Sequence, residues 1–270
     1  MAEIKTEISG TTKLFGCLAH PTSHVRAPTL FNRIFADNHK DAVMVPVDIA
    51  PQTLAQGIAG LQAMPNFLGA AVTIPHKMTM AALCDELGPV AQITGAVNAV
   101  RFDKGRIFGD NFDGAGFVAG LKGQGHQLAG KRCLLIGAGG AARAIAYGLC
   151  GEEIASLDVT NRSIDKADML VAAVLAHRTD APLKVCQMPD YGAYDIVINA
   201  TALGLYETDA MPCDPDALAE QALVCDIIMV PEQTKWLQAA QDRGIAIHYG
   251  RHMLDHQIPL IGAFIGVDTL

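Results

Sequence analysis

The stretch KRCLLIGAGGAARAIAYGL, residues 131–149, decides the fold. A short apolar run passes through a glycine cluster into an alanine-rich segment typical of a helix. The cluster fits the pattern G-x-G-x-x-A, in which the first glycine permits a tight turn and the second lets a pyrophosphate approach the backbone. The small last residue lets the helix pack on the strand, and the helix N-terminus attracts phosphate. We predict a dinucleotide-binding loop, with a glycine-rich structural turn as the alternative. The loop residues expected to contact the cofactor are Gly137, Ala138, Gly139, Gly140 and Ala141.

The next strand-like run, SLDVT at 156–160, bears on the choice of cofactor. A site for NAD usually has an acidic residue after this strand to bind the ribose, whereas an arginine suits the 2′-phosphate of NADP. Here the run is followed by Asn161-Arg162-Ser163, with Lys166 nearby. We favour NADP, but NAD stays open because Asp158 and Asp165 are close in sequence, and a solvated turn is the simpler alternative.

Strand-like runs alternate with helical patterns on both sides of the loop. This alternation is typical of parallel strands covered by helices on both faces. The polar stretch 110–114 divides two such series, and Asp103-Lys104-Gly105 indicates a hairpin turn. We predict the α/β class with two domains: an N-terminal α/β substrate domain with a mostly parallel sheet, and a Rossmann-like dinucleotide-binding domain. One continuous α/β sheet is the alternative. Strands are expected at 13–18, 42–49, 67–74, 95–102, 106–111, 131–136, 156–160, 194–200 and 222–230, and a helix over 78–87.

Composition excludes several classes of protein. The chain has 270 residues, of which 50% are hydrophobic and 18% charged, and this excludes intrinsic disorder. Its net charge is −8 with no basic run, so nucleic acid and anionic membrane are not expected partners. The longest uncharged stretch, 49–75, contains prolines and glutamines and reads as buried structure rather than a bilayer span. Seven scattered cysteines without a CxxC pair predict reduced thiols and a cytoplasmic protein. The histidines near the expected cleft lack the spacing of a zinc site, so no metal is predicted.

Two polar segments interrupt otherwise apolar sequence. One is VTIPHK at 72–77, directly after a strand, and the other is GDNFDG at 109–114. Hydride transfer to a carbonyl requires a group that protonates or stabilises the developing alkoxide, and a lysine near a carboxylate does this. Lys77 and Asp113 are therefore candidate catalytic residues. The alternatives are a solvated loop cation and a turn residue.

The sequence resembles the shikimate dehydrogenase family over nearly its whole length. Each family motif has a counterpart here. The matching segments are AVTIPHK (71–77), GAVNAV (95–100), GDNFDGAGF (109–117), GAGGA (137–141), NRS (161–163), NATALG (199–204) and GRHMLDHQ (250–257).

The resemblance implies an activity and a division of labour. It implies reversible NAD(P)-dependent hydride transfer to or from a ring hydroxyl or ketone of shikimate, quinate or a related cyclic acid, as in aromatic amino acid biosynthesis. Residues 1–112 and 248–270 would form a discontinuous substrate domain, and 113–247 the cofactor domain, in a monomer or homodimer. Lys77 and Asp113 would be the catalytic pair. Substrate contacts are expected from Thr73, Asn98 and Gln257, and further cofactor contacts from Asn161, Arg162, Ser163, Lys166, Thr201 and Met229.

One motif departs from the family pattern. Where the family has two serines that hold the substrate carboxylate, this chain has Val25 and Ala27. Losing two hydrogen bonds to a charged group costs roughly 3–6 kcal/mol. Phe112 and Met229 likewise replace polar family residues. We therefore expect the carboxylate end of the substrate to be altered, absent or held differently, for example by Arg26, unless Arg26 points away from its apolar neighbours along an extended strand.

Two other functions remain open. One alternative is a nucleotide-binding relative with little catalysis, serving as a sensor or regulator. The other is a dehydrogenase for a ring compound that lacks the shikimate carboxylate. The altered motif at Val25 and Ala27 favours these readings, whereas retention of Lys77 and Asp113 favours a catalytically active enzyme.

Overall fold

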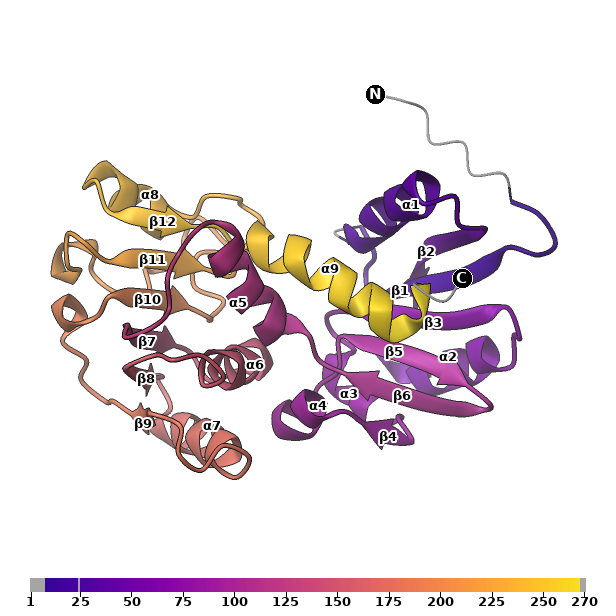
Figure 1. The fold of residues 1–270 in the computed structure, drawn as a ribbon, viewed down its shortest axis with the longest axis horizontal. Helices are drawn as coiled ribbons and strands as arrows, with labels where there is room; N and C mark the ends of the chain where they lie inside the picture. The colour runs from indigo at the N-terminus through magenta and orange to yellow at the C-terminus, as the bar shows by residue number, and fades with distance from the viewer. Residues whose placement is uncertain (1–7, 24, 268–270) are drawn as a thin grey trace. The chain divides into compact units, whose positions relative to one another are not determined.

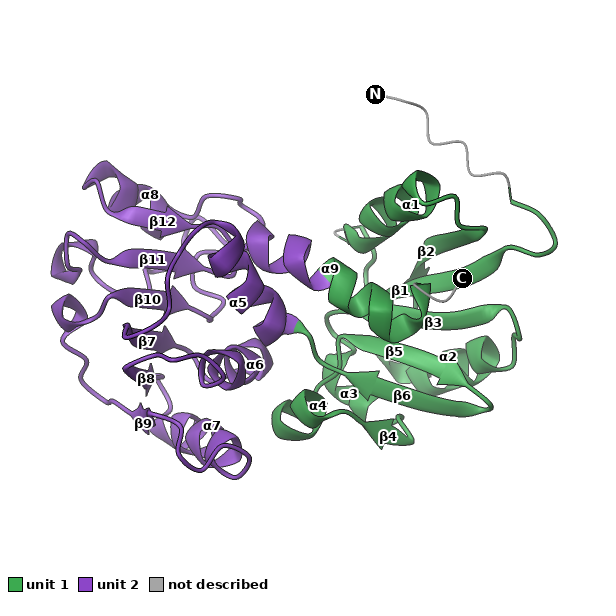
Figure 2. Ribbon diagram, in the orientation of Figure 1, with its two compact units in different colours: residues 1–112, 258–270 green, residues 113–257 purple. Residues whose placement is uncertain are grey.

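The computed structural model describes residues 8–23 and 25–267, so His24 of the N-terminal motif lies outside the described residues. The chain forms two compact units (Figures 1 and 2). Unit 1 contains residues 1–112 and 258–270, and unit 2 contains residues 113–257. The return to the first unit therefore lies ten residues later than the expected 248. The physical reason is that residues up to His248 still form the last strand of the second sheet.

Unit 1 is built on a mixed sheet with the strand order β2-β1-β3-β5-β6-β4 among the described residues. The first three strands in this order are parallel, and β5 is antiparallel to both of its neighbours. The predicted hairpin is confirmed, because β5 and β6 are joined through Lys104 and Gly105, which both have positive φ as a tight turn requires. The strands are β1 (Lys13–Ala19), β2 (Ala42–Asp48), β3 (Phe67–Val72), β4 (Glu86–Leu87), β5 (Ala99–Asp103) and β6 (Arg106–Asp110).

The helices of unit 1 bury apolar side chains against this sheet. One core cluster joins Leu18 and Val72 of the sheet to Leu54 and Ile58 of the helix that follows β2. Burial of such side chains stabilises the fold by about 1.5–3 kcal/mol each. The helices are α1 (Ala27–Asp37), α2 (Leu54–Gln62), preceded by the 3-10 turn η1 (Pro51–Thr53), α3 (Lys77–Ala81), α4 (Pro89–Thr94) and, from residue 258 on, the end of α9 (Arg251–Ile265).

The helix expected over 78–87 is wrong in its second half. Helix α3 ends at Ala81, and the chain then enters the short strand β4. Asp85 causes this change, because its backbone N–H donates to the Ile107 carbonyl (2.9 Å) and its carboxylate accepts from the Ile107 N–H (2.7 Å). This pairing with β6 competes with continuation of the helix.

Unit 2 contains an all-parallel sheet with the strand order β12-β11-β10-β7-β8-β9 in the described part of the chain. The chain starts in the middle of this sheet at β7 and builds outward on both sides, which is the Rossmann-like arrangement that we predicted. The strand expected over 222–230 is shorter than predicted: β11 ends at Asp226. The strands are β7 (Arg132–Ile136), β8 (Ser156–Thr160), β9 (Leu183–Val185), β10 (Ile196–Asn199), β11 (Leu223–Asp226) and β12 (Ala246–His248).

Helix packing in unit 2 depends on close backbone approach. A Cβ on Gly114 would lie 1.9 Å from the Ala144 carbonyl oxygen, so only glycine lets the two helices meet there. On another side of the same helix, a Cβ on Gly116 would lie 2.7 Å from the Cβ of Gln257. These two close contacts set the position of Asp113, the first residue of that helix. The elements are α5 (Asp113–Gly123), α6 (Gly140–Leu149), α7 (Ile164–Leu175), α8 (Lys235–Asp242), the start of α9, and the turns η2 (Tyr191–Ala193) and η3 (Pro215–Ala217).

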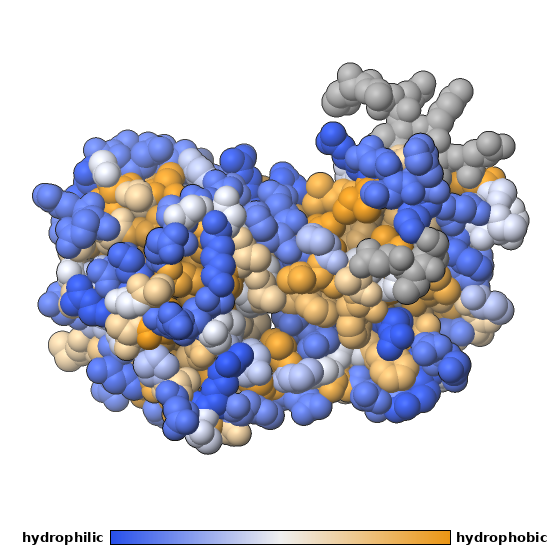
Figure 3. Space-filling view, in the orientation of Figure 1, coloured by the Kyte–Doolittle hydropathy of each residue, from blue (hydrophilic) through white to orange (hydrophobic). Residues whose placement is uncertain are grey.

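The surface is mixed in character. On the face drawn in Figure 3, hydrophilic residues interrupt the apolar areas of both units. Within the described residues, no helix combines the length and the apolar character that crossing a bilayer requires.

Candidate active site

In unit 1 the predicted substrate contacts gather at one edge of the sheet. The carboxyl ends of β1, β2, β3 and β6 lie at the same edge, together with the amino end of the antiparallel strand β5. Thr73 follows β3 and its N–H donates to the Leu18 carbonyl (3.0 Å). Asn98 precedes β5, and its carbonyl accepts from the Val72 N–H (2.7 Å). Ligands of open α/β sheets bind outside the carboxyl ends of the strands, which makes this edge the candidate substrate site.

Lys77 stands at the same edge as the first residue of α3. Its side chain is half-buried, and its carbonyl accepts from the Val97 N–H (3.0 Å). This bond ties the loop after β3 to the loop that carries Asn98. His76, beside it, is 1% exposed, and its Nε2 has no hydrogen-bond partner among the described residues.

Asn98 also fixes the chain that leads out of unit 1. Its Oδ1 accepts from the Phe112 N–H (2.9 Å), and Nδ2 of Asn111 donates to the Ala96 carbonyl (3.2 Å). Asp110 accepts from the N–H groups of Ala91 and Asn111, while burial raises the pKa of its carboxyl. The residue that follows this anchored segment is Asp113, which is 2% exposed. Lys77 belongs to unit 1 and Asp113 to unit 2, so the pairing of the two side chains is a proposal.

The divergent loop after β1 is held by a carboxylate. Asp48, at the end of β2, accepts from His20 Nδ1 (2.7 Å) and from the N–H and hydroxyl of Thr22 (3.1 and 3.3 Å). The hydrogen bond with His20 is the main reason that the pKa of Asp48 lies below its usual range. Val25 is half-buried and Ala27 is buried as the first residue of α1.

One expectation about this region needs correction. Arg26 does not lie on an extended strand: it has αR backbone angles as the N-cap of α1, and its side chain is exposed. Strand geometry therefore does not turn its side chain away from the site. Phe112, which replaces a polar family residue, packs on Phe264 of α9 with 5.3 Å between ring centroids.

In unit 2 the glycine loop has the geometry that a phosphate loop needs. Gly137 has φ +120°, and a Cβ there would lie 2.8 Å from the Ala200 carbonyl oxygen, so this residue must be glycine. At Gly139, the extended N-cap of α6, a Cβ would meet no atom within 4 Å. The backbone at Gly139 is thus approachable from outside, and helix α6 begins there. These residues fit the pyrophosphate of a dinucleotide.

Cations lie beside this loop. The Gly137 N–H donates to the Thr160 carbonyl (2.8 Å), so the end of β8 is next to the loop. Beyond it, Nδ2 of Asn161 bonds the Ser163 carbonyl (2.8 Å), while Arg162 and Lys166 are exposed and form no ion pair within the described chain. Residues that recognise a 2′-phosphate would be expected here.

The nearby acid Asp158 serves another purpose. It is 7% exposed and accepts from the Tyr194 hydroxyl (2.8 Å), with Lys184 of β9 3.9 Å away. It therefore lies inside the strand β8 and is engaged before the carboxyl edge is reached. Asp165, the other acid near the turn, lies exposed in the first turn of α7.

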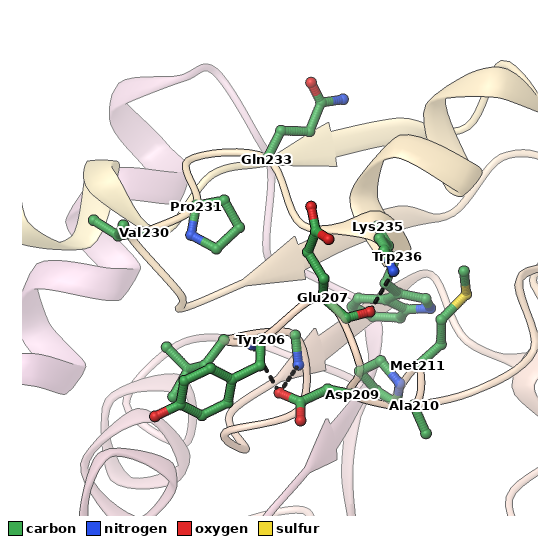
Figure 4. A pocket seen from close by; sticks show the side chains of 13 residues that line it. Tyr206, Glu207, Asp209, Ala210, Met211, Val230, Pro231, Gln233, Lys235 and Trp236 are labelled. Carbon is green, nitrogen blue, oxygen red and sulfur yellow. Dashed lines mark hydrogen bonds between the residues drawn. The ribbon is translucent and has the colours of Figure 1, made fainter.

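The loops after β10 and β11 carry the last two predicted cofactor contacts, Thr201 and Met229, both half-buried. A cavity of 360 Å³ opens beside these loops (Figure 4). Its outer loop is shaped by Asp209, whose carboxylate accepts from the N–H groups of Gly204 and Tyr206 (3.1 and 3.0 Å), and by Lys235, which donates to the Glu207 carbonyl. Gln257, a predicted substrate contact, lies on α9 and is 5% exposed.

Both halves of the chain match one protein family. Residues 17–100 match the shikimate dehydrogenase substrate binding domain, and residues 120–229 match shikimate / quinate 5-dehydrogenase. The chain belongs to the shikimate dehydrogenase family. The resemblance stated from the motifs is therefore confirmed, as are the fold class and membership in a family of NAD(P)-dependent oxidoreductases acting on CH–OH groups.

The proteins that this chain resembles differ in what they are named for. The shikimate dehydrogenase (NADP+) of Moorella thermoacetica is 36% identical over 258 residues, covering 93% of this chain and 87% of its own. A structure of the Thermus thermophilus shikimate 5-dehydrogenase with NADP(H) and shikimate superposes with TM-score 0.85 at 28% identity, covering 94% and 93% of the two chains. The 5-ketofructose reductase of a Gluconobacter strain superposes with TM-score 0.82 at 30% identity, covering 93% and 91%.

Sequence reasoning missed several polar residues at these edges. They include Asp48, Asn199 and Asp226, each the last residue of its strand, and Arg143 in the second turn of α6. The signal that could have found these three is a polar residue at the end of an otherwise apolar strand. No group of three or more His, Cys, Asp or Glu residues suited to a metal occurs in the described part of the molecule.

Proposed function

We propose that this chain is an NADP-dependent dehydrogenase that interconverts a ring hydroxyl and a ketone on shikimate, quinate or a closely related compound. Unit 1 would bind the substrate and unit 2 the cofactor. The observation that carries the proposal is the gathering of Thr73, Lys77 and Asn98 at the carboxyl edge of one sheet, in a chain whose second sheet carries a complete dinucleotide loop.

The chemistry divides between the cofactor and two side chains. When bound, NADP+ would supply the hydride acceptor for oxidation of the ring carbon. In oxidation the neutral Lys77 amine would take up the hydroxyl proton at Nζ, and the resulting ammonium would return it in reduction. Asp113 would stabilise that ammonium form. Thr73, Asn98 and Gln257 orient the neighbouring hydroxyls of the ring.

Local charge supports NADP over NAD. Arg162, Ser163 and Lys166 offer two cations and a hydroxyl at the end of β8, where a 2′-phosphate would lie. Asp158, the acid that would otherwise favour NAD, is engaged with Tyr194. Relatives named as NADP+ enzymes agree with this choice.

The test is a dehydrogenase assay. Shikimate and quinate are each offered with NADP+ and with NAD+, and reduced nicotinamide is followed by absorbance. We expect turnover with NADP+ to exceed turnover with NAD+. Tight NADP+ binding without turnover on either acid, or on the uncharged compounds named below, would instead support the sensor function.

A second candidate substrate lacks the carboxylate. In the loop after β1 the side chains of Val25 and Ala27 offer no hydrogen bond, and the Thr22 hydroxyl is used by Asp48. The first turn of α1 adds little, because the N–H groups of Thr29 and Leu30 already donate to the Arg26 carbonyl. The likeness to a 5-ketofructose reductase, named for a substrate without a carboxylate, agrees with this reading.

Matched substrates separate the two candidates. Shikimate and its methyl ester differ by one charge, and 5-ketofructose with NADPH tests a neutral ketone. If the carboxylate is not recognised, the ester reacts as fast as the acid or faster, and Val25→Ser with Ala27→Ser raises kcat/KM for shikimate. A large loss of shikimate oxidation in Arg26→Ala would instead show that Arg26 holds the carboxylate.

A further inference from the structure

A buried carboxylate ties together the two loops at the edge of the second sheet. Asp226, at the end of β11, is 0% exposed. Its oxygens accept from Nδ2 of Asn199 (3.2 Å to each), from the Ile228 N–H (3.0 Å) and from the Thr234 hydroxyl (2.9 Å). These donors come from the end of β10, from the loop after β11 and from the N-cap of α8. One side chain therefore joins three elements.

The connection continues from Asn199 to the predicted cofactor loop. Oδ1 of Asn199, also fully buried, accepts from the N–H and hydroxyl of Thr201 (3.0 and 2.7 Å), and its Nδ2 also donates to the Leu203 carbonyl (3.0 Å). The Thr201 hydroxyl in turn accepts from the Leu203 N–H (3.0 Å). The loop thus has one hydrogen-bonded arrangement, set by Asn199.

This loop lies directly against the phosphate loop. A Cβ on Gly137 would lie 2.8 Å from the Ala200 oxygen and 3.1 Å from Cγ2 of Thr201. On the other side, a Cβ on Gly250 would lie 2.5 Å from the Ile228 carbonyl oxygen, so the loop after β11 is equally confined. A shift of Asp226 would be transmitted to Thr201 and Gly137 through contacts without free space.

The charge of Asp226 has no cationic counterpart in the described structure, since all its bonding partners are neutral donors. The ionisable group next to it is the Cys225 thiol on the same strand, whose pKa burial raises far above its usual value. A buried charge without a counterion costs free energy of desolvation, which its hydrogen bonds offset only in part. Three donors aimed at one carboxylate therefore indicate a role in geometry.

We propose that Asp226 is a positioning residue for cofactor binding, acting through Asn199 to hold Thr201 against Gly137. The proposal rests on the proposed function, because it assumes that this edge receives NADP+. Protonation of Asp226 would remove an acceptor that its three donors share and would loosen both loops. Burial raises the pKa of Asp226 to about 6, so the effect falls within the range of an ordinary binding assay.

The experiment is a titration of the full-length protein with NADP+ at pH values from 5 to 8. The variants are Asp226→Asn and a matched control, Asp158→Asn, which replaces a buried carboxylate of the same sheet that bonds Tyr194 and not the loops. We expect Asp226→Asn to weaken NADP+ binding about tenfold or more at pH 8, the size of effect that loss of one hydrogen bond to a charged group has on an equilibrium constant. Asp158→Asn should leave the Kd within about twofold, because Asp158 bonds Tyr194 and neither of the two loops.

The pH profile separates positioning from a general loss of structure. Wild-type affinity should fall as the pH drops through about 6, whereas Asp226→Asn should keep only the change due to the cofactor's own phosphate, which titrates near pH ~6. Equal Kd values and equal profiles for wild type and Asp226→Asn would overturn the proposal. Wild-type protein that binds neither NADP+ nor NAD+ would instead overturn the proposed function.

A second pair of variants decides the case if Asp226→Asn does not fold. Thr234→Val removes the hydroxyl that donates to Asp226, while Thr234→Ser keeps it. Thr234 also caps α8, accepting from the Leu237 N–H (3.3 Å), and serine retains that role. We expect Thr234→Val to bind NADP+ more weakly than Thr234→Ser. The same affinity in both folded variants would refute the positioning role.

Discussion

The two units present polar groups at the carboxyl edges of their sheets by different means. In unit 2 the edge is shaped by backbone: a glycine with φ +120°, an open glycine at a helix start, and loops pressed against them. In unit 1 the edge is shaped by side chains that clamp loops, such as Asn98 on the Phe112 N–H and Asp48 on the loop after β1. A backbone site suits a constant ligand, whereas a side-chain site changes its ligand with a few substitutions.

The largest expected effect tests whether chemistry and cofactor recognition are divided between the units. Lys77→Met removes Nζ but keeps the apolar stem, so we expect kcat to fall by about 10²–10⁴, as loss of a general acid–base does. The Kd of NADP+ should not change. The matched variant in unit 2 is Lys166→Met, for which loss of a charge-assisted bond to the 2′-phosphate should raise the Kd of NADP+ by roughly 10- to 100-fold.

Binding and turnover measured on both variants decide this comparison. The Kd of NAD+, which has no 2′-phosphate, serves as the control and should be the same for Lys166→Met and wild type. Near-normal turnover in Lys77→Met would remove the proposed mechanism, and equal losses of NADP+ and NAD+ affinity in Lys166→Met would remove its role in selectivity.

The same contrast explains what the sequence could predict. The glycine loop and the hairpin at Lys104-Gly105 follow from local requirements, since each depends on residues adjacent in the chain. The parallel sheet could be predicted from the repeated alternation of strand-like and helical segments. The short strand β4 could not be predicted, because it depends on pairing of Asp85 with Ile107, distant in sequence. Asp226 and Asn199 were missed for a similar reason: the partner that gives each its meaning lies on another strand.

A smaller effect is expected from the histidines of unit 2. His248 is 1% exposed at the end of β12, and burial, with the nearby His252, His126 and His256, lowers its pKa to about 3. The unfolded chain has a pKa near ~6.5 for this residue, so it binds more protons than the folded protein between these values. Stability is therefore complete above pH ~6.5 and decreases as the pH falls, by about 2–3 kcal/mol at pH ~4.5.

Unit 1 offers the contrasting pair for this prediction. His20 and Asp48 are bonded but nearly half exposed, so solvent and salt screen their interaction. Urea unfolding at pH values from 4.5 to 7.5, followed by the fluorescence of the single tryptophan, Trp236 in unit 2, measures the effect. His248→Phe should flatten the pH dependence, whereas His20→Phe should leave it intact. A steep dependence retained in His248→Phe would assign it to other groups.

The smallest effect separates two glycines of one loop. Gly137→Ala places a Cβ 2.8 Å from the Ala200 oxygen in a left-handed conformation, so we expect the free energy of unfolding to fall by about 1–3 kcal/mol. At Gly139 the backbone is extended and the space is open, so alanine should change stability by less than about 0.5 kcal/mol. Both variants should bind NADP+ more weakly, Gly137→Ala because the loop is displaced and Gly139→Ala because its methyl group lies where the pyrophosphate approaches. Urea unfolding with and without NADP+ measures both quantities at once, since a ligand stabilises only the state that binds it. If Gly139→Ala kept full affinity, the pyrophosphate would not approach this part of the backbone. Unit 2 would then have to bind the cofactor through side chains, as unit 1 is proposed to bind its substrate.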